Sequence, residues 1–442
     1  MKKDLTIAIT GDAIINRRIS LHTEERFISL IKIIREADVA YTHLETLIHD
    51  YEGPEIYPAA EAGWTWMRSP RLAADELKWA GFDIVSLASN HTLDYSYGGL
   101  YSTWKALDKV GLVHAGTGRN LGEAREPAYL ETGNGRVALV SMCSSFTGWA
   151  RAGKVRPDVG GRPGLNPLRF YYVADAATLH GIKNLFTRLG WWVRKVDKEW
   201  LFHPAGLHHA IIKFVEGDQP GISTAVYEED AEENLQSIME AKKRADFVLV
   251  HLHSHEWHPQ EGLSVPAKFF TDFARNCIDT GADMFIGNGS HAYLRGIELY
   301  KDKPIFYDPG DFMAMTETVE RLPADFYLSP GLDPKIRNSK ATPADAFAAR
   351  KALPAPLNPP GGYHTAKVLG SVVAVCRFGG GKELNEIKLY PVILTGKPAS
   401  QSGRPMLADS EMSKKIVDYL AELSAPFETK IEFKDGAGVV KL

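Results

Sequence analysis

Residues 5–46 read LTIAITGDAIINRRISLHTEERFISLIKIIREADVAYTHLET, and this stretch decides the fold. A short β-branched run at 5–10 is followed by an amphipathic segment at 25–37 and by a second short run at 38–43. Strands that alternate with helices in this way predict parallel βα units, in which each helix connects one strand to the next. The chain is therefore expected to be built on an α/β sheet.

The alternation continues along the chain, with three irregular or added regions. Further strand-like runs lie at 83–89, 135–143, 246–253, 283–288, 296–300 and 303–308. Residues 147–225 are Gly-, Pro- and Arg-rich with aromatic stretches, which predicts an insertion over the main sheet. The Pro-rich residues 316–364 are expected to form an excursion near the mouth of the site. Residues 365–442 are expected to add strands and a helix.

The composition is that of an ordinary folded protein, with 44% hydrophobic and 24% charged residues in 442. With a formal net charge of -4, the chain has no excess of positive charge that would bind nucleic acid or an acidic membrane surface. No stretch approaches the roughly 18 to 20 apolar residues of a membrane helix. The first residues also lack the apolar core and cleavage site of a signal peptide. We therefore expect a cytoplasmic protein that acts on small or locally docked substrates.

Polar residues gather where five of the apolar runs end. These clusters are Gly11-Asp12, His43-Leu44-Glu45, Ser89-Asn90-His91, His253-Ser254-His255-Glu256 and Gly287-Asn288-Gly289-Ser290-His291. In open α/β sheets, ligands bind outside the carboxyl ends of the strands. Any one of these residues could instead cap a helix or bond a loop amide. Together, two carboxylates, an amide oxygen and several imidazoles form a ligand set that suits Zn, Mn or Fe.

The same clusters carry a family resemblance. The signature segments are GDAIINR (11–17), HLET (43–46), SLASNHTLDY (86–95), RPGLNPL (162–168), GADMFIGNGSH (281–291) and IELYKDKPIFYDPGDF (297–312). In this order they resemble the capsule-biosynthesis CapA family, whose domain is similar to the calcineurin-like metallophosphoesterases. The resemblance implies a single domain over 1–442. Its expected fold is a four-layer α/β/β/α sandwich of the metallophosphoesterase type with an inserted loop and helix region and a C-terminal β addition.

The resemblance also implies roles for individual residues. The positions that match metal ligands are Asp12, Glu45, Asn90, His253 and His291. His91 matches the catalytic imidazole, and Asp94 is placed to orient its ring. Arg17 closes the Gly-Asp motif and could hold an anionic substrate oxygen, and Arg162, in a rigid Gly/Pro loop, is a second candidate for substrate contact. One or two divalent cations, Mn, Zn or Fe, would lower the pKa of a bound water.

Three positions depart from the family pattern. Where the family has Gly-His-x-Pro-His, this chain has Asn288 in place of the first histidine, which leaves open whether one metal binds or two. Where the family has His-Trp-Gly-x-Glu, His255 and Glu256 are candidates for a compensating ligand. A loop histidine bonded to solvent or backbone is the alternative for His255. Where the family has Gly-Asn-Phe, Asp311 adds one potential negative charge.

Three functions remain open from the sequence. The leading hypothesis is a metal-dependent hydrolase that cleaves an amide or peptide-like bond in a small acidic substrate, for example a γ-glutamyl compound. A metallophosphoesterase is the closest alternative, because the same groups would serve a phosphoester. A non-catalytic poly-γ-glutamate capsule biosynthesis factor is the third. Neither nucleic acid nor membrane is expected as a partner, and the oligomeric state is left open.

Overall fold

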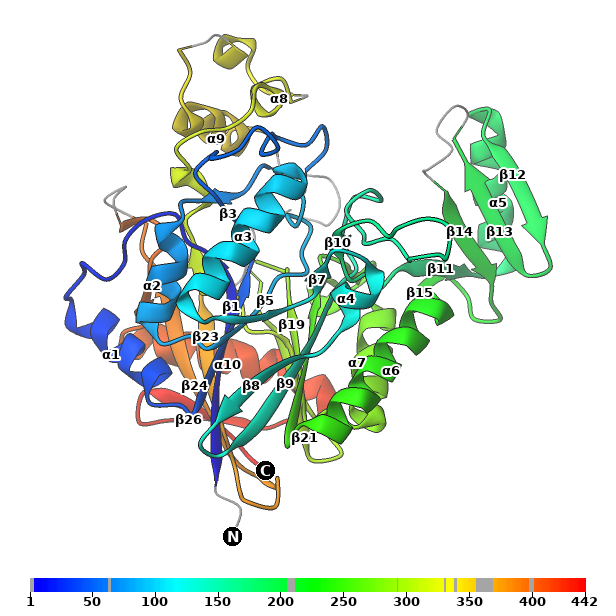
Figure 1. Ribbon diagram of the computed structural model, residues 1–442. Coiled ribbons are helices and arrows are strands. Elements are labelled where there is room, and N and C mark those ends of the chain that lie inside the picture. Colours follow the sequence, from blue (N-terminus) through cyan, green and yellow to red (C-terminus); the bar gives the residue numbers. More distant parts are fainter. Residues whose placement is uncertain are drawn as a thin grey trace.

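The computed structural model describes residues 4–62, 65–204, 211–291, 293–329, 331–337, 340–354, 369–396 and 401–442. Two β-sheets pack face to face, and helices cover the outer face of each (Figure 1). The expected four-layer arrangement is confirmed. No helix in these ranges has both the length and the apolar character needed to cross a membrane.

The first sheet is a 10-stranded mixed sheet. Its main path runs β26 (Ile431–Lys434), β27 (Ala437–Val440), β24 (Leu384–Leu394), β23 (Ser371–Phe378), β1 (Leu5–Ile14), β2 (Val39–Leu44), β5 (Ile84–Ser86) and β6 (Val113–Ala115). The strands β1, β2, β5 and β6 are mutually parallel, whereas β23 is antiparallel to β1. The predicted βα units therefore form one half of this sheet, and the C-terminal strands form the other.

Three helices cover the outer face of the first sheet: α1 (Glu25–Arg35), α2 (Leu72–Ala80) and α3 (Ser96–Val110). The buried residues of α1 are Phe27, Leu30, Ile31 and Ile34, spaced as one face of a helix requires. They pack with Ala8 and Ala40, which point outward from β1 and β2. Apolar residues that recur about every 3.6 positions in the helix thus pack against apolar residues that recur every second position in the strands, and together they form one apolar layer.

The second sheet is 6-stranded. Its order is β20 (Arg295–Tyr300), β21 (Lys303–Asp308), β19 (Met284–Asn288), β16 (Phe247–His253), β9 (Gly135–Cys143) and β8 (Ala128–Thr132). Two helices, α6 (Glu228–Arg244) and α7 (Lys268–Thr280), pack on its outer face. The two sheets then bury their inner faces against each other.

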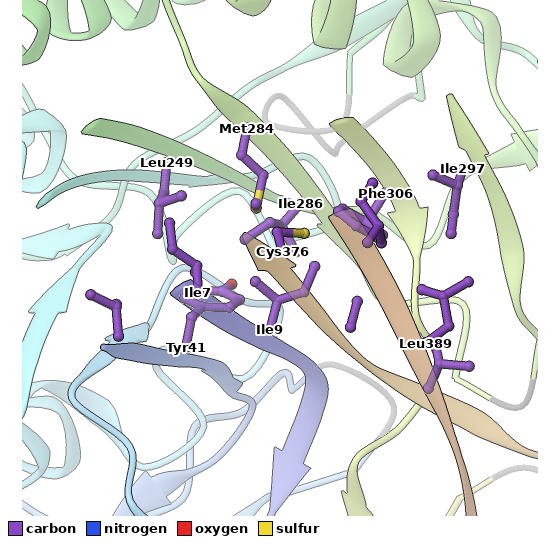
Figure 2. Close-up of a cluster of buried hydrophobic side chains, with 14 of the residues drawn as sticks. Ile7, Ile9, Tyr41, Leu249, Met284, Ile286, Ile297, Phe306, Cys376 and Leu389 are labelled. Atoms are coloured by element: carbon purple, nitrogen blue, oxygen red, sulfur yellow. The ribbon is translucent and has the colours of Figure 1, made fainter. Parts of the chain in front are cut away.

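The core between the sheets is apolar over most of its height. Figure 2 shows Ile7, Ile9 and Tyr41 of the first sheet meeting Leu249, Met284 and Ile286 of the second. Residues of α10 (Ser410–Ser424), including Ile416 and Leu420, complete this cluster.

Residues 170–226 form a small α/β unit. Its 5-stranded sheet has the order β12 (Trp192–Val196), β13 (Glu199–His203), β14 (Ile212–Glu216), β11 (Phe170–Ala174) and β15 (Ile222–Val226), with α5 (Ala176–Arg188) beside it. Much of the predicted loop and helix region is therefore strand. Its aromatic residues form a core of their own, in which Phe186 stacks on Trp191 and contacts Phe202. The unit projects away from the two sheets (Figure 1).

Short elements complete the described chain. They are β3 (Leu47–Ile48), β4 (Arg68–Ser69), β7 (Thr117–Gly118), α4 (Leu121–Arg125), β10 (Gly164–Leu165), β17 (Trp257–His258), β18 (Gly262–Pro266), β22 (Met313–Ala314), α8 (Ala324–Tyr327), α9 (Pro343–Lys351) and β25 (Pro405–Leu407), with three 3-10 turns at Thr316–Thr318, Pro334–Arg337 and Ala425–Phe427. Within the Pro-rich excursion, Phe326 and Phe347 share an apolar cluster with Ile14 and Leu93, which lie close in sequence to Asp12 and His91. Residues 355–368 of the excursion lie outside the described ranges.

Candidate metal centre

The predicted polar clusters come together at one end of the two sheets. Asp12 pairs with His43 between β1 and β2, and His253 pairs with Asn288 between β16 and β19. A bulge in β1 precedes Asp12. Gly11 is required there because a Cβ on it would lie 1.6 Å from the carbonyl oxygen of Gly310. The backbone of β1 can therefore touch the loop that carries Asp311.

Two carboxylates form the centre of the cluster. The side chains of Asp12 and Glu45 are fully buried, and none of their four oxygens has a hydrogen-bond partner among the described residues. Burial, and then the charge of Glu45, raise the pKa of Asp12 well above its usual value. Burial also raises the pKa of Glu45, against the charges of His291 and His91. Buried ionised carboxylates are several kcal/mol unfavourable without a cation, so this pair fits a metal site.

Imidazoles surround these carboxylates. His253 Nε2 lies 3.0 Å from Asn90 Oδ1 and 3.5 Å from Glu45 Oε1. His255 Nε2 lies 2.9 Å from His253 Nε2 and 3.9 Å from Glu45 Oε1. Burial and the neighbouring rings lower the pKa of both histidines well below the usual value, which leaves them neutral. Neutral imidazoles that converge on carboxylates are the donors that Zn, Mn or Fe prefers.

His291 lies near the other carboxylate oxygen of Glu45. Its Nδ1 lies 3.7 Å from Asp12 Oδ2, 3.7 Å from Glu45 Oε2 and 3.3 Å from Asp311 Oδ1. Burial alone lowers its pKa, but the charges of Glu45 and Asp311 outweigh this and raise it well above the usual value. The residue has a φ of 56°, a left-handed conformation that is unfavourable for a residue with a Cβ. Such strain is common where a side chain is held for a functional task.

His91 and Asp94 form a hydrogen-bonded pair beside the cluster. His91 Nδ1 lies 2.6 Å from Asp94 Oδ2, which also accepts the backbone N–H of Met67 at 2.7 Å. The other ring nitrogen, Nε2, lies 3.8 Å from Glu45 Oε1. Burial alone would lower the pKa of His91, but the charge and hydrogen bond of Asp94 raise it above the usual value. The ring can therefore carry a proton and present it on Nε2.

Comparison with known proteins places this chain in a family. A model of the bacterial capsule synthesis protein PGA_cap matches residues 6–316. The chain belongs to this family. The resemblance expected from the sequence is confirmed.

Several relatives of this PGA_cap chain carry names. The uncharacterized protein y4sH of Sinorhizobium fredii is 33% identical over 450 residues, 99% of this chain and 93% of its own. The PGA biosynthesis protein CapA of Bacillus subtilis is 23% identical over 70% of this chain and 63% of its own. A solved structure named putative 5'-nucleotidase from Staphylococcus aureus in complex with alpha-ketoglutarate has a TM-score of 0.37 and 10% identity, covering 95% of this chain and 59% of its own.

Three of the residues expected at the site of this PGA_cap chain have other partners. Glu256 accepts hydrogen bonds from the hydroxyls of Ser144, Ser145 and Ser254. Arg17 donates from Nη2 to the carbonyl oxygen of Ser402. The exposed Arg162 donates to the carbonyl oxygen of Arg151.

Further buried residues, to which the sequence gave no individual role, lie around the cluster. His43 stacks on His251, with ring centroids 4.6 Å apart, and lies tilted against His253 at 4.7 Å. Burial lowers the pKa of His43 to about 3. Arg295 is fully buried and donates to the carbonyl oxygen of Glu256 at 2.9 Å. Asp308 accepts the backbone N–H groups of Ser290 and Gly310. The only sequence signal for the last two is a charge inside a largely apolar run.

Proposed function

We propose that this PGA_cap-family protein is a metal-dependent hydrolase that cleaves an amide or peptide-like bond in a small acidic substrate, with γ-glutamyl compounds as the first class to test. One observation carries the proposal. Two fully buried carboxylates without hydrogen-bond partners among the described residues face three imidazoles and lie beside a His-Asp pair. Relatives named for capsule and PGA biosynthesis supply the substrate class.

The residues that would hold the cation are Asp12, Glu45, Asn90, His253 and His291. Their oxygen and nitrogen donors suit Mn, Zn or Fe. The three cysteines, Cys143, Cys277 and Cys376, are free and buried. When bound, a divalent cation supplies a Lewis acid and lowers the pKa of water toward neutrality. The sites for nucleophile and substrate are therefore expected on the side of the cluster toward His91.

His91 would protonate the leaving group. Asp94 holds Nδ1 and so fixes both the orientation of the ring and the position of the mobile proton on Nε2. An amine is expelled from a tetrahedral carbon only once its nitrogen is protonated, so an amide substrate requires such an acid. Positioned general acids contribute about 10²–10⁴-fold to rate.

The test is an assay of the purified protein with Mn, Zn or Fe against γ-glutamyl peptides and phosphoesters in parallel. Release of amine or amino acid, lost in Asp12→Ala but kept in Asp418→Asn on the exposed face of α10, is the expected result. Phosphoester hydrolysis without amide hydrolysis would replace the proposal by a metallophosphoesterase. A protein that holds no metal, and whose thermal stability does not respond to metal or to Asp12→Ala, would contradict the metal centre itself.

A further inference from the structure

We propose that His255 and Asp311 are ligands that complete two cation positions, which share Glu45. The inference rests on the proposed function, because it assigns further ligands of the same centre. With these ligands, two cations are expected to bind.

The first position is formed by Asp12, His291 and Asp311. One ligand atom of each lies within 4.8 Å of the others. Asp311 Oδ1 is 3.3 Å from His291 Nδ1, and the loop that carries it is fixed to β1 because Phe312 N donates to the carbonyl oxygen of Asp12 at 2.9 Å. A carboxylate is thus held beside Asp12, whose own two oxygens have no hydrogen-bond partner within the described chain.

The second position is formed by Glu45, Asn90, His253 and His255. The Nε2 atoms of His253 and His255 are 2.9 Å apart, and both face Glu45 Oε1. Asn90 Oδ1 lies 3.0 Å from His253 Nε2. Glu45, His255 and His291 also place one ligand atom each within 4.8 Å of one another. Glu45 can therefore contribute to both positions.

His255 is held in place by a network of hydrogen bonds. Its backbone N–H donates to Ser145 Oγ at 2.7 Å, and that hydroxyl donates to the Glu256 carboxylate. The buried Arg295 donates to the carbonyl oxygen of Glu256 from the other side. Glu256, itself a candidate ligand from the sequence, instead acts as a positioning residue for His255. This network argues against a loop histidine that merely meets solvent.

The charge of the cluster favours two cations. Three carboxylates, those of Asp12, Glu45 and Asp311, lie around His291 at the centre of the cluster. A single divalent cation would leave one negative charge uncompensated in a buried site, and two would leave one positive charge that an anionic substrate or hydroxide can neutralise. The number of charged ligands is a main determinant of cation affinity. Asn288 is neutral, so it does not change this sum of carboxylate and cation charges.

The experiment measures bound metal rather than activity. Mn²⁺ content after dialysis and Mn²⁺ affinity by calorimetry are compared for the wild type, Asp311→Asn and His255→Ala. The matched controls are Asp418→Asn and His258→Ala, which change an exposed aspartate and a histidine that pairs with Glu261. Two ions per chain are expected for the wild type and both controls. In each ligand variant one ion is expected to bind at least tenfold more weakly, while circular dichroism stays unchanged.

Two results would overturn the inference. If the wild-type protein saturates at one ion, the inference of two cation positions is overturned, but the proposed hydrolase function is not. Both ligand variants binding two ions with wild-type affinity would also overturn it, because His255 and Asp311 would then not be ligands. A wild type that binds no metal would contradict the proposed function itself. Asp311→Asn is nearly isosteric, so it is the variant least exposed to a folding defect.

Discussion

The space between the two sheets changes character along the same strands. At one end β16 contributes Leu249 to a fully apolar core, and four residues later it contributes His253 to the cluster. β2 does the same with Tyr41 and the residue just beyond its end, Glu45. Both ends are buried to a similar degree, yet only the apolar end stabilises the fold by burial. Burial of the polar groups at the other end costs desolvation free energy, and residues that are kept despite such a cost are typical of a functional site.

The largest effect is expected on rate at the polar end. His91→Gln should lower the hydrolysis rate by about 10²–10⁴-fold, because it removes the proton donor. Metal content by elemental analysis should stay at the wild-type level, since His91 is not among the expected ligands. A variant that loses metal together with rate would instead make His91 a ligand.

At the apolar end, the expected effect is on stability alone. Leu249→Ala should lower the free energy of unfolding by about 2–5 kcal/mol, because it removes buried apolar surface and leaves a cavity. Urea denaturation measures the change. Metal affinity should be unaltered, and a large loss of metal affinity would show that the two ends are coupled and break the comparison.

In the metal-free protein, a mutation at the polar end should raise the free energy of unfolding, whereas Leu249→Ala lowers it. Glu45→Gln removes a buried charge whose folded-state pKa is raised, and should raise the free energy of unfolding at pH 7 by about 1–3 kcal/mol. The raised pKa makes Glu45 destabilising as pH rises through its unfolded value, and the glutamine removes that dependence. Chelated samples of both proteins, melted side by side, test this. Lower stability of the variant would mean that the carboxylate is satisfied without metal.

The smallest effect concerns pH. The pKa of His43 is lowered to about 3, so the neutral ring is favoured in the folded protein and its contribution is lost as pH falls below the unfolded value near 6.5. Between pH 6.5 and 5 the wild type should lose about 2 kcal/mol from this group. His43→Gln should show a shallower decline in urea melts at those pH values. An identical slope in both proteins would remove His43 from the acid response.

Sequence patterns predicted the layers and most of the cluster because both depend on local order. The β-branched runs fix the strands, and a polar residue just past each run is brought to the common edge that parallel strands share. The same reasoning did not predict the strands of residues 170–226, where short strands and a Gly- and Pro-rich approach look like loops. The roles expected for Arg17 and Arg162 rest on motif position and stay predictions; in the structure these side chains donate to the carbonyl oxygens of Ser402 and Arg151.

The sequence by itself determined that Asp12, Glu45, Asn90, His91 and His253 meet at strand ends, because the positions of the strands and of the polar residues that follow them can be read along the chain. The tertiary structure alone decided what each side chain touches there. It placed Asp311 against His291, directed Glu256 to three serine hydroxyls and held His255 toward Glu45. Most of these contacts join residues far apart in the chain, and hydrogen-bond geometry at the level of a few tenths of an ångström has no signature in residue type or spacing.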